Sequence, residues 1–389
     1  MAFLSEGMDG AERVWDGLRE SSFPLSDDIR LMYEALVSLT ACHSPLATLD
    51  VGAAGTVLRF LLPLAALHCD EPVRFSGSMR LFQRPLAPLL EALAKFGTAW
   101  KKDKNGGLLI PPESKPDYLE LEVDGSLSSQ FISGLAMSSA ALSGGGIIRW
   151  KSDVVSRPYL SLTKLWLERF GCRASLLDNS FEVQGGLKYR TQKVEDGVEI
   201  NGDWSAAAVA FCVAAVMGKD LKVGPLDNTD GQPDVAVLEI LKKVGCSWRI
   251  NNGECHFDGR LDEAVNADLL GCPDLAPPLA ALAVFAPGVS ILRGLRALPN
   301  KESDRLGGII NLVEWLGGRA ELLPGPSLKI YPALLSKKSP VAAMPFDPMD
   351  DHRLAFAAAI GSLKVGGTIL NMECVNKSWP GFWQWAKIK

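Results

Sequence analysis

The chain has 389 residues, of which 47% are hydrophobic and 22% are charged, so it can bury large cores and is longer than most single domains. Its net charge of −5 argues against nonspecific nucleic-acid binding, which needs a basic surface. The longest apolar run, residues 60–67, is too short to span a bilayer, and no signal-peptide pattern precedes it. We therefore expect two domains, no nucleic-acid partner and no membrane segment.

The cysteines and histidines indicate neither disulfides nor a metal. The eight cysteines form no CxxC pair, and several lie inside apolar runs; they are Cys42, Cys69, Cys172, Cys212, Cys246, Cys255, Cys272 and Cys374. Buried free thiols fit the reducing cytoplasm, where we place the protein. The four histidines have no paired ligand spacing, so we expect no metal and no cofactor.

The first forty residues predict two helices. Residues 1–7, MAFLSEG, resemble the end of an apolar helix, and they match the AVMG and VFAPG endings found later in the chain. Residues 28–39, DIRLMYEALVSL, predict the second helix. Compared with the repeated units that follow, this first unit lacks its polar beginning.

Aspartates then precede apolar runs at nearly constant intervals of 74, 79, 71 and 76 residues. These five acids, each at the head of a unit, are Asp50, Asp124, Asp203, Asp274 and Asp350. Between them, an amphipathic stretch repeatedly stops at a glycine and is followed by two short β-like segments; the glycines are Gly97, Gly171, Gly245 and Gly318. Two interleaved series with one period indicate a repeated unit.

Each unit is predicted to contain a helix, a strand, a second helix and a hairpin. In the fourth unit these are residues 275–286, a strand near 289–292, residues 302–317 and residues 320–332. The period suits a small α/β module. Each polar head precedes an apolar helix, where unpaired backbone N–H groups and the positive end of the helix dipole attract anions. If the heads converge, the protein binds anionic ligands.

A β-like segment ends at residues 199–202, just before the third head, with similar amounts of repeat on either side. We therefore predict two domains, residues 1–201 and residues 202–389.

The heads carry motifs that resemble the 5-enolpyruvylshikimate-3-phosphate (EPSP) synthase family, the 3-phosphoshikimate 1-carboxyvinyltransferases. Nine motifs occur in the family's order over nearly the whole chain: AAGTVLRFL (53–61), MRLFQRP (79–85), GSLSSQFISGLAM (125–137), VSRPYLSLT (155–163), GDWSAA (202–207), PDLAPPLA (273–280), NKESDRL (300–306), DDHRLA (350–355) and NKSWPGFW (376–383). The resemblance implies the enolpyruvyl transferase fold, an α/β fold in which each of two domains is an inside-out barrel of repeated βαβαββ units, here with the first unit truncated.

The resemblance implies an activity in the shikimate pathway, on the route to chorismate and the aromatic amino acids. The enolpyruvyl group of phosphoenolpyruvate would be transferred to the 5-hydroxyl of shikimate 3-phosphate, releasing phosphate. Both substrates carry a phosphate and a carboxylate, so the chemistry needs cations, a base for the hydroxyl proton and an acid for the methylene carbon. We expect these two small molecules as partners and a monomeric protein.

By match to the family's motifs, shikimate 3-phosphate would be held by serines, a glutamine, a tyrosine and two charged residues, namely Ser128, Ser129, Gln130, Ser156, Tyr159, Asp274 and Lys301. Phosphoenolpyruvate would contact a glycine, Gln130 and four cations, namely Gly55, Arg84, Gln130, Arg305, Arg353 and Lys377. Arginines suit its carboxylate because a guanidinium forms forked hydrogen bonds. Taken singly, helix caps and solvated surface charges are the plain alternatives for these residues.

The same match assigns the catalytic roles to Asp274, Glu302 and Lys377. Asp274 would accept the hydroxyl proton, and Glu302 and Lys377 are the candidates for moving the proton at the methylene carbon. An aspartate cap and an acidic first helical turn are the alternatives for Asp274 and Glu302. His352 is expected to be a packed neighbour of Arg353.

The sequence departs from the family's pattern at two places. By alignment, the family's first head, Lys-Ser-x-Ser-x-Arg, would end just upstream of Met1, so three substrate contacts and a strand of the second domain would be missing. As written, the chain would then be inactive or very slow, through a start site assigned too far downstream, a shortened chain or a degenerate homologue. Ala297 stands where the family has an asparagine near the shikimate ring.

Two other functions stay open. A noncatalytic anion-binding homologue would keep the head residues without turnover. The sister transferase, which acts on UDP-N-acetylglucosamine, has a loop cysteine shortly before the arginine that matches Arg84, whereas residues 76–83 contain no cysteine.

Overall fold

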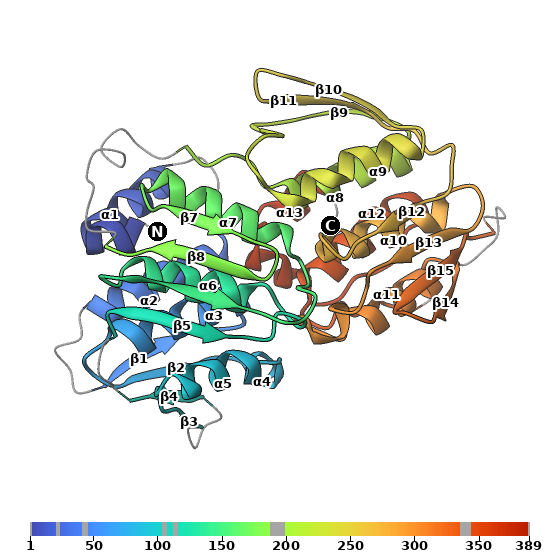
Figure 1. Ribbon diagram of the computed structural model, residues 1–389. Coiled ribbons are helices and arrows are strands. Elements are labelled where there is room, and N and C mark those ends of the chain that lie inside the picture. The colour runs from blue at the N-terminus through green and yellow to red at the C-terminus, as the bar shows by residue number, and fades with distance from the viewer. Residues whose placement is uncertain are drawn as a thin grey trace. The chain divides into compact units, whose positions relative to one another are not determined.

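The chain divides into two compact units, Met1–Glu199 and Ile200–Lys389 (Figure 1). The computed structural model describes residues 2–20, 24–40, 46–102, 107–111, 116–186, 199–334 and 344–387. The start of the 1–7 segment, at Met1, and Cys42 lie outside these residues. The predicted boundary after residue 201 is close to the division between the units, and the role predicted for each domain stays a prediction.

Unit 1 contains two sheets covered by helices. Its helices are α1 (Ala2–Glu20), α2 (Asp27–Thr40), α3 (Gly55–His68), α4 (Met79–Gln83), α5 (Ala87–Lys95), α6 (Gln130–Ala140) and α7 (Pro158–Arg169). Its strands are β1 (Ala47–Asp50), β2 (Val73–Ser76), β3 (Lys101–Lys102), β4 (Leu108–Ile110), β5 (Tyr118–Glu122), β6 (Gly145–Arg149), β7 (Ala174–Leu176) and β8 (Ser180–Gln184).

Unit 2 repeats the same kinds of element. Its α-helices are α8 (Trp204–Met217), α9 (Val237–Lys243), α10 (Ala276–Phe285), α11 (Arg305–Trp315), α12 (His352–Val365) and α13 (Phe382–Ala386). Its 3-10 helices are η1 (Pro233–Ala236), η2 (Pro273–Leu275), η3 (Leu298–Asn300) and η4 (Met372–Lys377). Its strands are β9 (Asp220–Val223), β10 (Ser247–Asn251), β11 (Glu254–Asp258), β12 (Asn266–Asp268), β13 (Ser290–Arg293), β14 (Arg319–Leu323) and β15 (Ser327–Tyr331).

Three sheets share one strand order, which confirms the repeat. The orders are β1-β2-β4-β3, β5-β6-β8-β7 and β12-β13-β15-β14, and in each the first pair is parallel while the other two pairs are antiparallel. A further sheet, β10-β11-β9, has the antiparallel part alone. The helices, strand and hairpin predicted for the fourth unit correspond to α10, β13, α11 and the β14–β15 hairpin, so that prediction is confirmed.

The apolar helices form the centre of each unit, and this packing brings the heads together. In unit 2, α8, α10 and α12 pack on one another and are largely buried. In unit 1, α3 packs closely against α6, and a Cβ at Gly134 would collide with the backbone of Arg59. Helices that are apolar on all sides must be enclosed in this way. Their N-terminal ends meet as well: Gln130 at the start of α6 bonds to Thr56 at the start of α3, and Arg353 at the start of α12 bonds to Ser205 at the start of α8.

The acids at the heads have different local roles. At or just beyond the end of the first strand of a unit, Asp50, Asp124 and Asp268 each accept a hydrogen bond from the backbone N–H two residues later, at 2.8–3.0 Å. The fourth head therefore uses Asp268 for this turn, which leaves Asp274 to a different role. In the fifth unit the N-cap is Asp351, and Asp350 precedes it with a φ of +55°.

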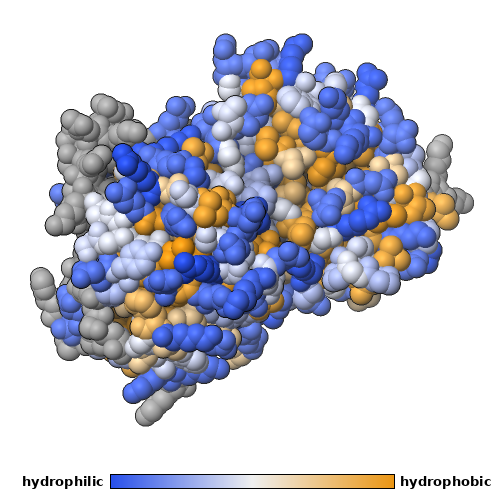
Figure 2. All heavy atoms as spheres, viewed as in Figure 1, coloured by the Kyte–Doolittle hydropathy of each residue, from blue (hydrophilic) through white to orange (hydrophobic). Residues whose placement is uncertain are grey.

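The visible surface mixes polar and apolar side chains in both units (Figure 2). The exposed large apolar residues are scattered over many elements, which is usual for a folded protein. Within the described ranges, no helix combines the length and the apolar composition needed to cross a membrane.

Candidate functional site

In unit 1, two buried arginines lie beside the first residue of α3. A Cβ placed on Gly55 would lie 2.6 Å from Nη1 of Arg84 and 3.1 Å from Nη1 of Arg59. Both arginine residues are buried, with exposures of 7% and 4%. Only glycine leaves room for two guanidinium groups at this helix N-terminus. Two positive charges and the start of α3 together favour a bound anion here.

Gln130, the first residue of α6, connects this helix to α3. Its side-chain Oε1 accepts a hydrogen bond from Nη1 of Arg59 at 2.8 Å, and its Nε2 donates to Oγ1 of Thr56 at 2.9 Å. Arg59 also lies over the ring of Phe131, with its guanidinium carbon 5.6 Å from the ring centroid. The structure thus gathers Gly55, Arg84 and Gln130 around one helix start.

The predicted serines lie at the starts of α6 and α7. Ser128 accepts a hydrogen bond from the backbone N–H of Gln130 at 3.3 Å, while Ser129, the N-cap residue, makes no side-chain cap bond. Ser156 has a φ of +57° and is buried, and its carbonyl accepts from the backbone N–H of Tyr159 at 3.0 Å. A serine in this left-handed region is unusual, and such backbone strain is concentrated at functional sites. The contacts of these residues to a substrate stay a prediction.

In unit 2, the carboxylate of Asp274 lies against three cations. Its Oδ1 accepts from Nζ of Lys301 at 3.2 Å and from Nη1 of Arg305 at 2.9 Å, and its Oδ2 is 3.1 Å from Nη2 of Arg353. Asp274 lies in η2, at the start of the buried helix α10, and its side chain does not cap that helix. The packing of α10 against α11 and α12 brings these residues together from three segments of the chain.

Arg305 is the fixed member of this cluster. Its side chain is 1% exposed, and its Nε and Nη2 bind the two oxygens of the fully buried Asp351 at 2.9 Å and 3.0 Å. Nη2 also binds Oε2 of Glu302 at 2.6 Å. Glu302 precedes α11, whose N-cap is Asp304, so it does not belong to the first turn of that helix. A forked, buried ion pair of this kind holds the guanidinium in one position.

These charges set the protonation of Asp274. Burial by itself would raise its pKa, but Arg353, Lys301 and Arg305 outweigh burial and lower the pKa of Asp274 well below its usual range. Asp274 is therefore ionised and, without a ligand, a very weak base. The cluster pairs three carboxylates with three cations, so an added anion must compete with Asp274 for these cations.

Arg353, Lys377 and His352 complete this group. Burial opposes the charge on Arg353, yet Asp274 raises its pKa above the usual value, so it stays protonated. Burial, Arg353 and Lys377 lower the pKa of His352 to about 3. His352 is buried and packs edge-on against Phe356, with ring centroids 5.8 Å apart. The expectation of a packed neighbour of Arg353 is thus confirmed, and the imidazole is neutral at neutral pH.

Three residues of these groups were not predicted from the sequence. They are Arg59, Ser205, whose hydroxyl accepts from Nη2 of Arg353 at 3.2 Å, and Asp351. Arg59 could have been found, because a charged residue inside the apolar run VLRFLLPL requires a partner when it is buried. Ser205 lies in the GDWSAA motif, but nothing in that motif indicates a contact with Arg353.

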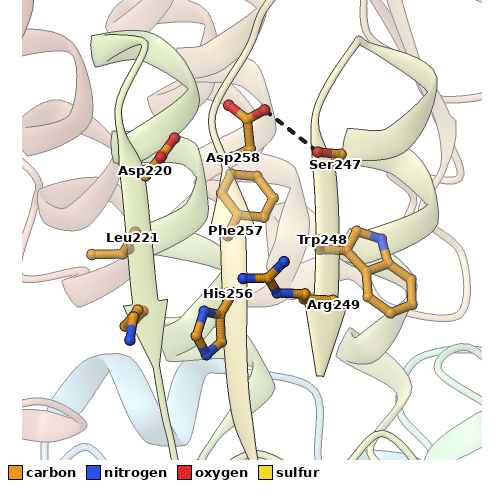
Figure 3. A pocket seen from close by; sticks show the side chains of 9 residues that line it. Asp220, Leu221, Ser247, Trp248, Arg249, His256, Phe257 and Asp258 are labelled. Atoms are coloured by element: carbon orange, nitrogen blue, oxygen red, sulfur yellow. Dashed lines mark hydrogen bonds between the residues drawn. The ribbon is translucent and has the colours of Figure 1, made fainter. Parts of the chain in front are cut away.

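A separate hollow of about 560 Å³ lies on the outer face of the β9–β11–β10 sheet (Figure 3). Lys222, His256 and Arg249 form a row across its strands. Glu254 pairs with His256 at 2.7 Å and with Lys222 at 3.5 Å, and Asp258 lies 3.5 Å from Ser247 (Figure 3). This mixed lining contains none of the predicted site residues. Among the described residues, no three His, Cys, Asp or Glu side chains are grouped as a metal site requires.

Comparison with known families identifies the origin of this arrangement. The sequence model of EPSP synthase (3-phosphoshikimate 1-carboxyvinyltransferase) matches residues 37–385. The chain belongs to the EPSP synthase family. The match includes both the Asp274 cluster and the residues around Gly55, so both groups fall inside the family's shared region.

Related proteins support the same assignment. The 3-phosphoshikimate 1-carboxyvinyltransferase of Methanoculleus marisnigri is 34% identical over 343 residues, which cover 87% of this chain and 78% of that protein. The enzyme of that name from Syntrophobacter fumaroxidans is also 34% identical, over 351 residues, with coverage of 87% and 79%.

Solved structures agree with the EPSP synthase fold. The EPSP synthase of Acinetobacter baumannii matches with a TM-score of 0.67 at 20% identity, covering 94% of this chain and 88% of that chain. The enolpyruvyl transferase NikO of Streptomyces tendae matches with a TM-score of 0.61 at 16% identity, covering 84% and 74%. The predicted enolpyruvyl transferase fold is confirmed.

Proposed function

We propose that this chain transfers the enolpyruvyl group of phosphoenolpyruvate to the 5-hydroxyl of shikimate 3-phosphate and releases phosphate. Membership of the EPSP synthase family supports the reaction. The observation that carries the residue assignment is the Asp274 carboxylate, held within 3.2 Å of Lys301, Arg305 and Arg353. A base beside cations suits a reaction that removes a hydroxyl proton next to anionic substrates.

The cations and helix starts would bind the substrates. In unit 2, Arg305, Arg353 and Lys377 would hold the carboxylate and phosphate of phosphoenolpyruvate. In unit 1, Gly55, Arg84 and Gln130 would contact the same substrate. The phosphate and ring of shikimate 3-phosphate would be held by hydroxyl, amide and charged groups, namely Ser128, Ser129, Gln130, Ser156, Tyr159, Asp274 and Lys301.

Anion binding would switch on Asp274 as a base. Without a ligand, three cations stabilise its ionised form and weaken its basicity. When the anionic groups of phosphoenolpyruvate bind Arg353 and Arg305, those cations are shared with the ligand, and the pKa of Asp274 rises. Asp274 then becomes an effective base only when phosphoenolpyruvate is bound.

The bonds follow an addition and an elimination. Asp274 takes the proton of the 5-hydroxyl as the hydroxyl oxygen bonds to C2 of phosphoenolpyruvate. Lys377 or Glu302 supplies a proton to the methylene carbon C3. In the second step Lys377 or Glu302 takes a proton back from C3, the C2=C3 double bond re-forms, and the C2–O bond breaks so that phosphate leaves with its electrons. No redox cofactor is needed, since electrons and protons balance over the two steps.

Phosphate release tests this proposal directly. Purified protein is incubated with phosphoenolpyruvate and either shikimate 3-phosphate or UDP-N-acetylglucosamine, using this chain and the longest product of its coding sequence. We expect phosphate and an enolpyruvyl product with shikimate 3-phosphate alone. Turnover only with the nucleotide sugar would replace the proposal with the sister activity. Binding of both proposed substrates without release, in both versions, would make the protein a noncatalytic homologue.

We also propose a cytoplasmic monomer. Seven described cysteines are free thiols, and five of them are buried, namely Cys172, Cys212, Cys246, Cys255 and Cys272. Unpaired thiols of this kind suit a reducing compartment. Cell fractionation and light scattering after size-exclusion chromatography test the two statements; recovery outside the cytoplasm or a dimer mass would refute one or the other.

A further inference from the structure

Ser205 provides a contact that joins two of the buried helices of unit 2. It is the second residue of α8, and it is buried with 6% exposure. Its backbone N–H donates to Oδ1 of Asp203, the N-cap, at 2.8 Å. Its hydroxyl lies 2.8 Å from both oxygens of the same carboxylate and accepts from Nη2 of Arg353, near the start of α12, at 3.2 Å.

These partners fix the direction of the hydroxyl. A serine hydroxyl has one hydrogen to donate and lone pairs that accept. Because an ionised carboxylate can only accept, the hydrogen goes to Asp203. The lone pairs are then left for the guanidinium of Arg353. Asp203 thus orients the hydroxyl of Ser205 so that its oxygen accepts a hydrogen bond from Arg353.

The contact with Ser205 is one of two that hold the side chain of Arg353. Its backbone N–H donates to Asp351 at 3.0 Å, which fixes the start of α12 but not the side chain. Within the described residues, Ser205 is the acceptor of its one side-chain hydrogen bond, and Asp274 is its ion-pair partner at 3.1 Å. Arg305 has a different support, since the buried Asp351 holds it on two nitrogens.

We infer that Asp203 and Ser205 form a positioning pair that sets the guanidinium of Arg353 for binding the carboxylate of phosphoenolpyruvate. The inference rests on the proposed function. When the ligand draws Arg353 away from Asp274, the bond to Ser205 remains and limits the guanidinium to one orientation. Ser205 itself does not touch the substrate, so its effect reaches the reaction through Arg353.

The test compares three substitutions of the hydroxyl and its partner. Ser205→Ala removes the acceptor but leaves the Asp203 cap on the backbone, and we expect the KM for phosphoenolpyruvate to rise about 10-fold, as for loss of a hydrogen bond to a charged group. The KM for shikimate 3-phosphate should change by less than about twofold. Ser205→Thr keeps the hydroxyl and should restore the wild-type value. Asp203→Asn, whose amide can donate and so reverse the hydroxyl, should raise the same KM.

The matched control is Ser362→Ala. Ser362 also lies in unit 2, on the same helix as Arg353, but its hydroxyl donates to the backbone carbonyl of Ala359 at 3.1 Å. This variant should keep the wild-type KM for phosphoenolpyruvate. Circular dichroism and thermal unfolding verify that all variants fold.

The outcomes separate this inference from the proposed function. An unchanged KM for phosphoenolpyruvate in folded Ser205→Ala, beside an active wild type, would overturn the positioning role alone. An equal rise in KM for both substrates would also overturn it. So would a KM for phosphoenolpyruvate in Ser205→Thr as high as in Ser205→Ala. If the wild type releases no phosphate, the proposed function fails, and calorimetric Kd values for phosphoenolpyruvate then decide the role of Ser205. A wild type that does not bind this ligand refutes both.

Discussion

Asp274 and Arg305 both form ion pairs, but Arg305 is enclosed by its partners whereas Asp274 stays partly exposed. Arg305 is enclosed by Asp351, Glu302 and Asp274, and its position is set by the protein alone. Asp274 is partly exposed, at 21% of its side chain, and its partners include Arg353 and Lys301, whose side chains are 15% and 22% exposed. A ligand can reach these exposed contacts but not the pair between Arg305 and Asp351. The cluster therefore combines a rigid, enclosed ion pair between Arg305 and Asp351 with exposed contacts of Asp274 that a ligand can replace.

Replacing Asp274 with alanine should separate binding from turnover. We expect kcat to fall by about 10³-fold or more, because the variant lacks the base for the hydroxyl proton. The KM for phosphoenolpyruvate should not rise, since its cations no longer share a protein carboxylate. Steady-state kinetics measure both effects, the fall in kcat and the KM for phosphoenolpyruvate.

The control for this variant is Asp220→Ala, which removes an exposed carboxylate from the outer face of β9. Its turnover should equal that of the wild type. Unchanged kcat in Asp274→Ala would remove this residue from the mechanism.

His352 should make folding stability fall in mildly acidic solution. Its pKa is about 3 in the folded protein, against an ordinary value of 6.5. Between these values the unfolded chain binds the proton and the folded chain does not, so stability decreases as pH falls below about 6.5. From pH 8 to pH 5 the loss from this residue is about 2 kcal/mol. Asp274, with its lowered pKa, contributes below this window.

Denaturant titrations at several pH values measure this effect, with His352→Gln as the comparison. The variant should lose less stability than the wild type between pH 8 and pH 5, whatever its stability at pH 8. Parallel curves for the two proteins would contradict the buried, neutral state of His352.

Aspartates cap the N-termini of α11 and α12, but the two caps differ in burial and in their further contacts. Asp304 caps α11 through the backbone N–H of Gly307 at 3.2 Å and is exposed. Asp351 caps α12 through the backbone N–H of Arg353 and also accepts from Ser303 and twice from Arg305, without any exposure. The second cap therefore fixes two helices, α11 and α12, relative to each other.

Alanine substitutions at these two caps should differ in cost. Asp304→Ala should lower the free energy of unfolding by about 1 kcal/mol, the usual value for an N-cap. Asp351→Ala should lower it by about 3–5 kcal/mol, because it leaves the charge of Arg305 buried without its main partner. Asp351→Asn, which can still cap the helix, should retain most of the larger loss. Equal effects at both positions, measured by chemical denaturation, would contradict the role of the buried pair.

The repeated elements could be predicted from the sequence because their signals are local. Apolar periodicity and turn residues locate α10, β13, α11 and the β14–β15 hairpin. The glycine of the segment 1–7 does not end its helix, because α1 extends from Ala2 to Glu20.

The sequence alone could not predict which acid forms the turn or the cap at each head. Several acids lie near each head, and which one forms the turn or cap depends on where the preceding strand ends. The regular spacing identified Asp274 and Asp350 as the acids at these heads, whereas Asp268 forms the turn and Asp351 forms the cap. The contact of Ser205 with Arg353 joins residues 148 apart in sequence, and no local pattern predicts it.

At the scale of the whole molecule, each unit has its own hydrophobic core. One continuous core contains buried residues from Ala35 to Val183, all within unit 1. The other contains residues from Trp204 to Ala386, all within unit 2. A buried core of its own is the main requirement for a domain that folds independently. The two units should therefore lose their structure in separate steps.

Two matched core substitutions test this independence. Leu49 in β1 and Leu292 in β13 are both fully buried, one in each unit. Each substitution by alanine should lower the stability of its own unit by about 2–5 kcal/mol, through lost burial and the cavity that remains. Urea unfolding followed by hydrogen exchange and mass spectrometry should show earlier exchange in residues 46–186 for Leu49→Ala and in residues 200–387 for Leu292→Ala. If either substitution lowers the protection of both units equally, the chain unfolds as one cooperative body, because independent units transmit no loss of stability to each other.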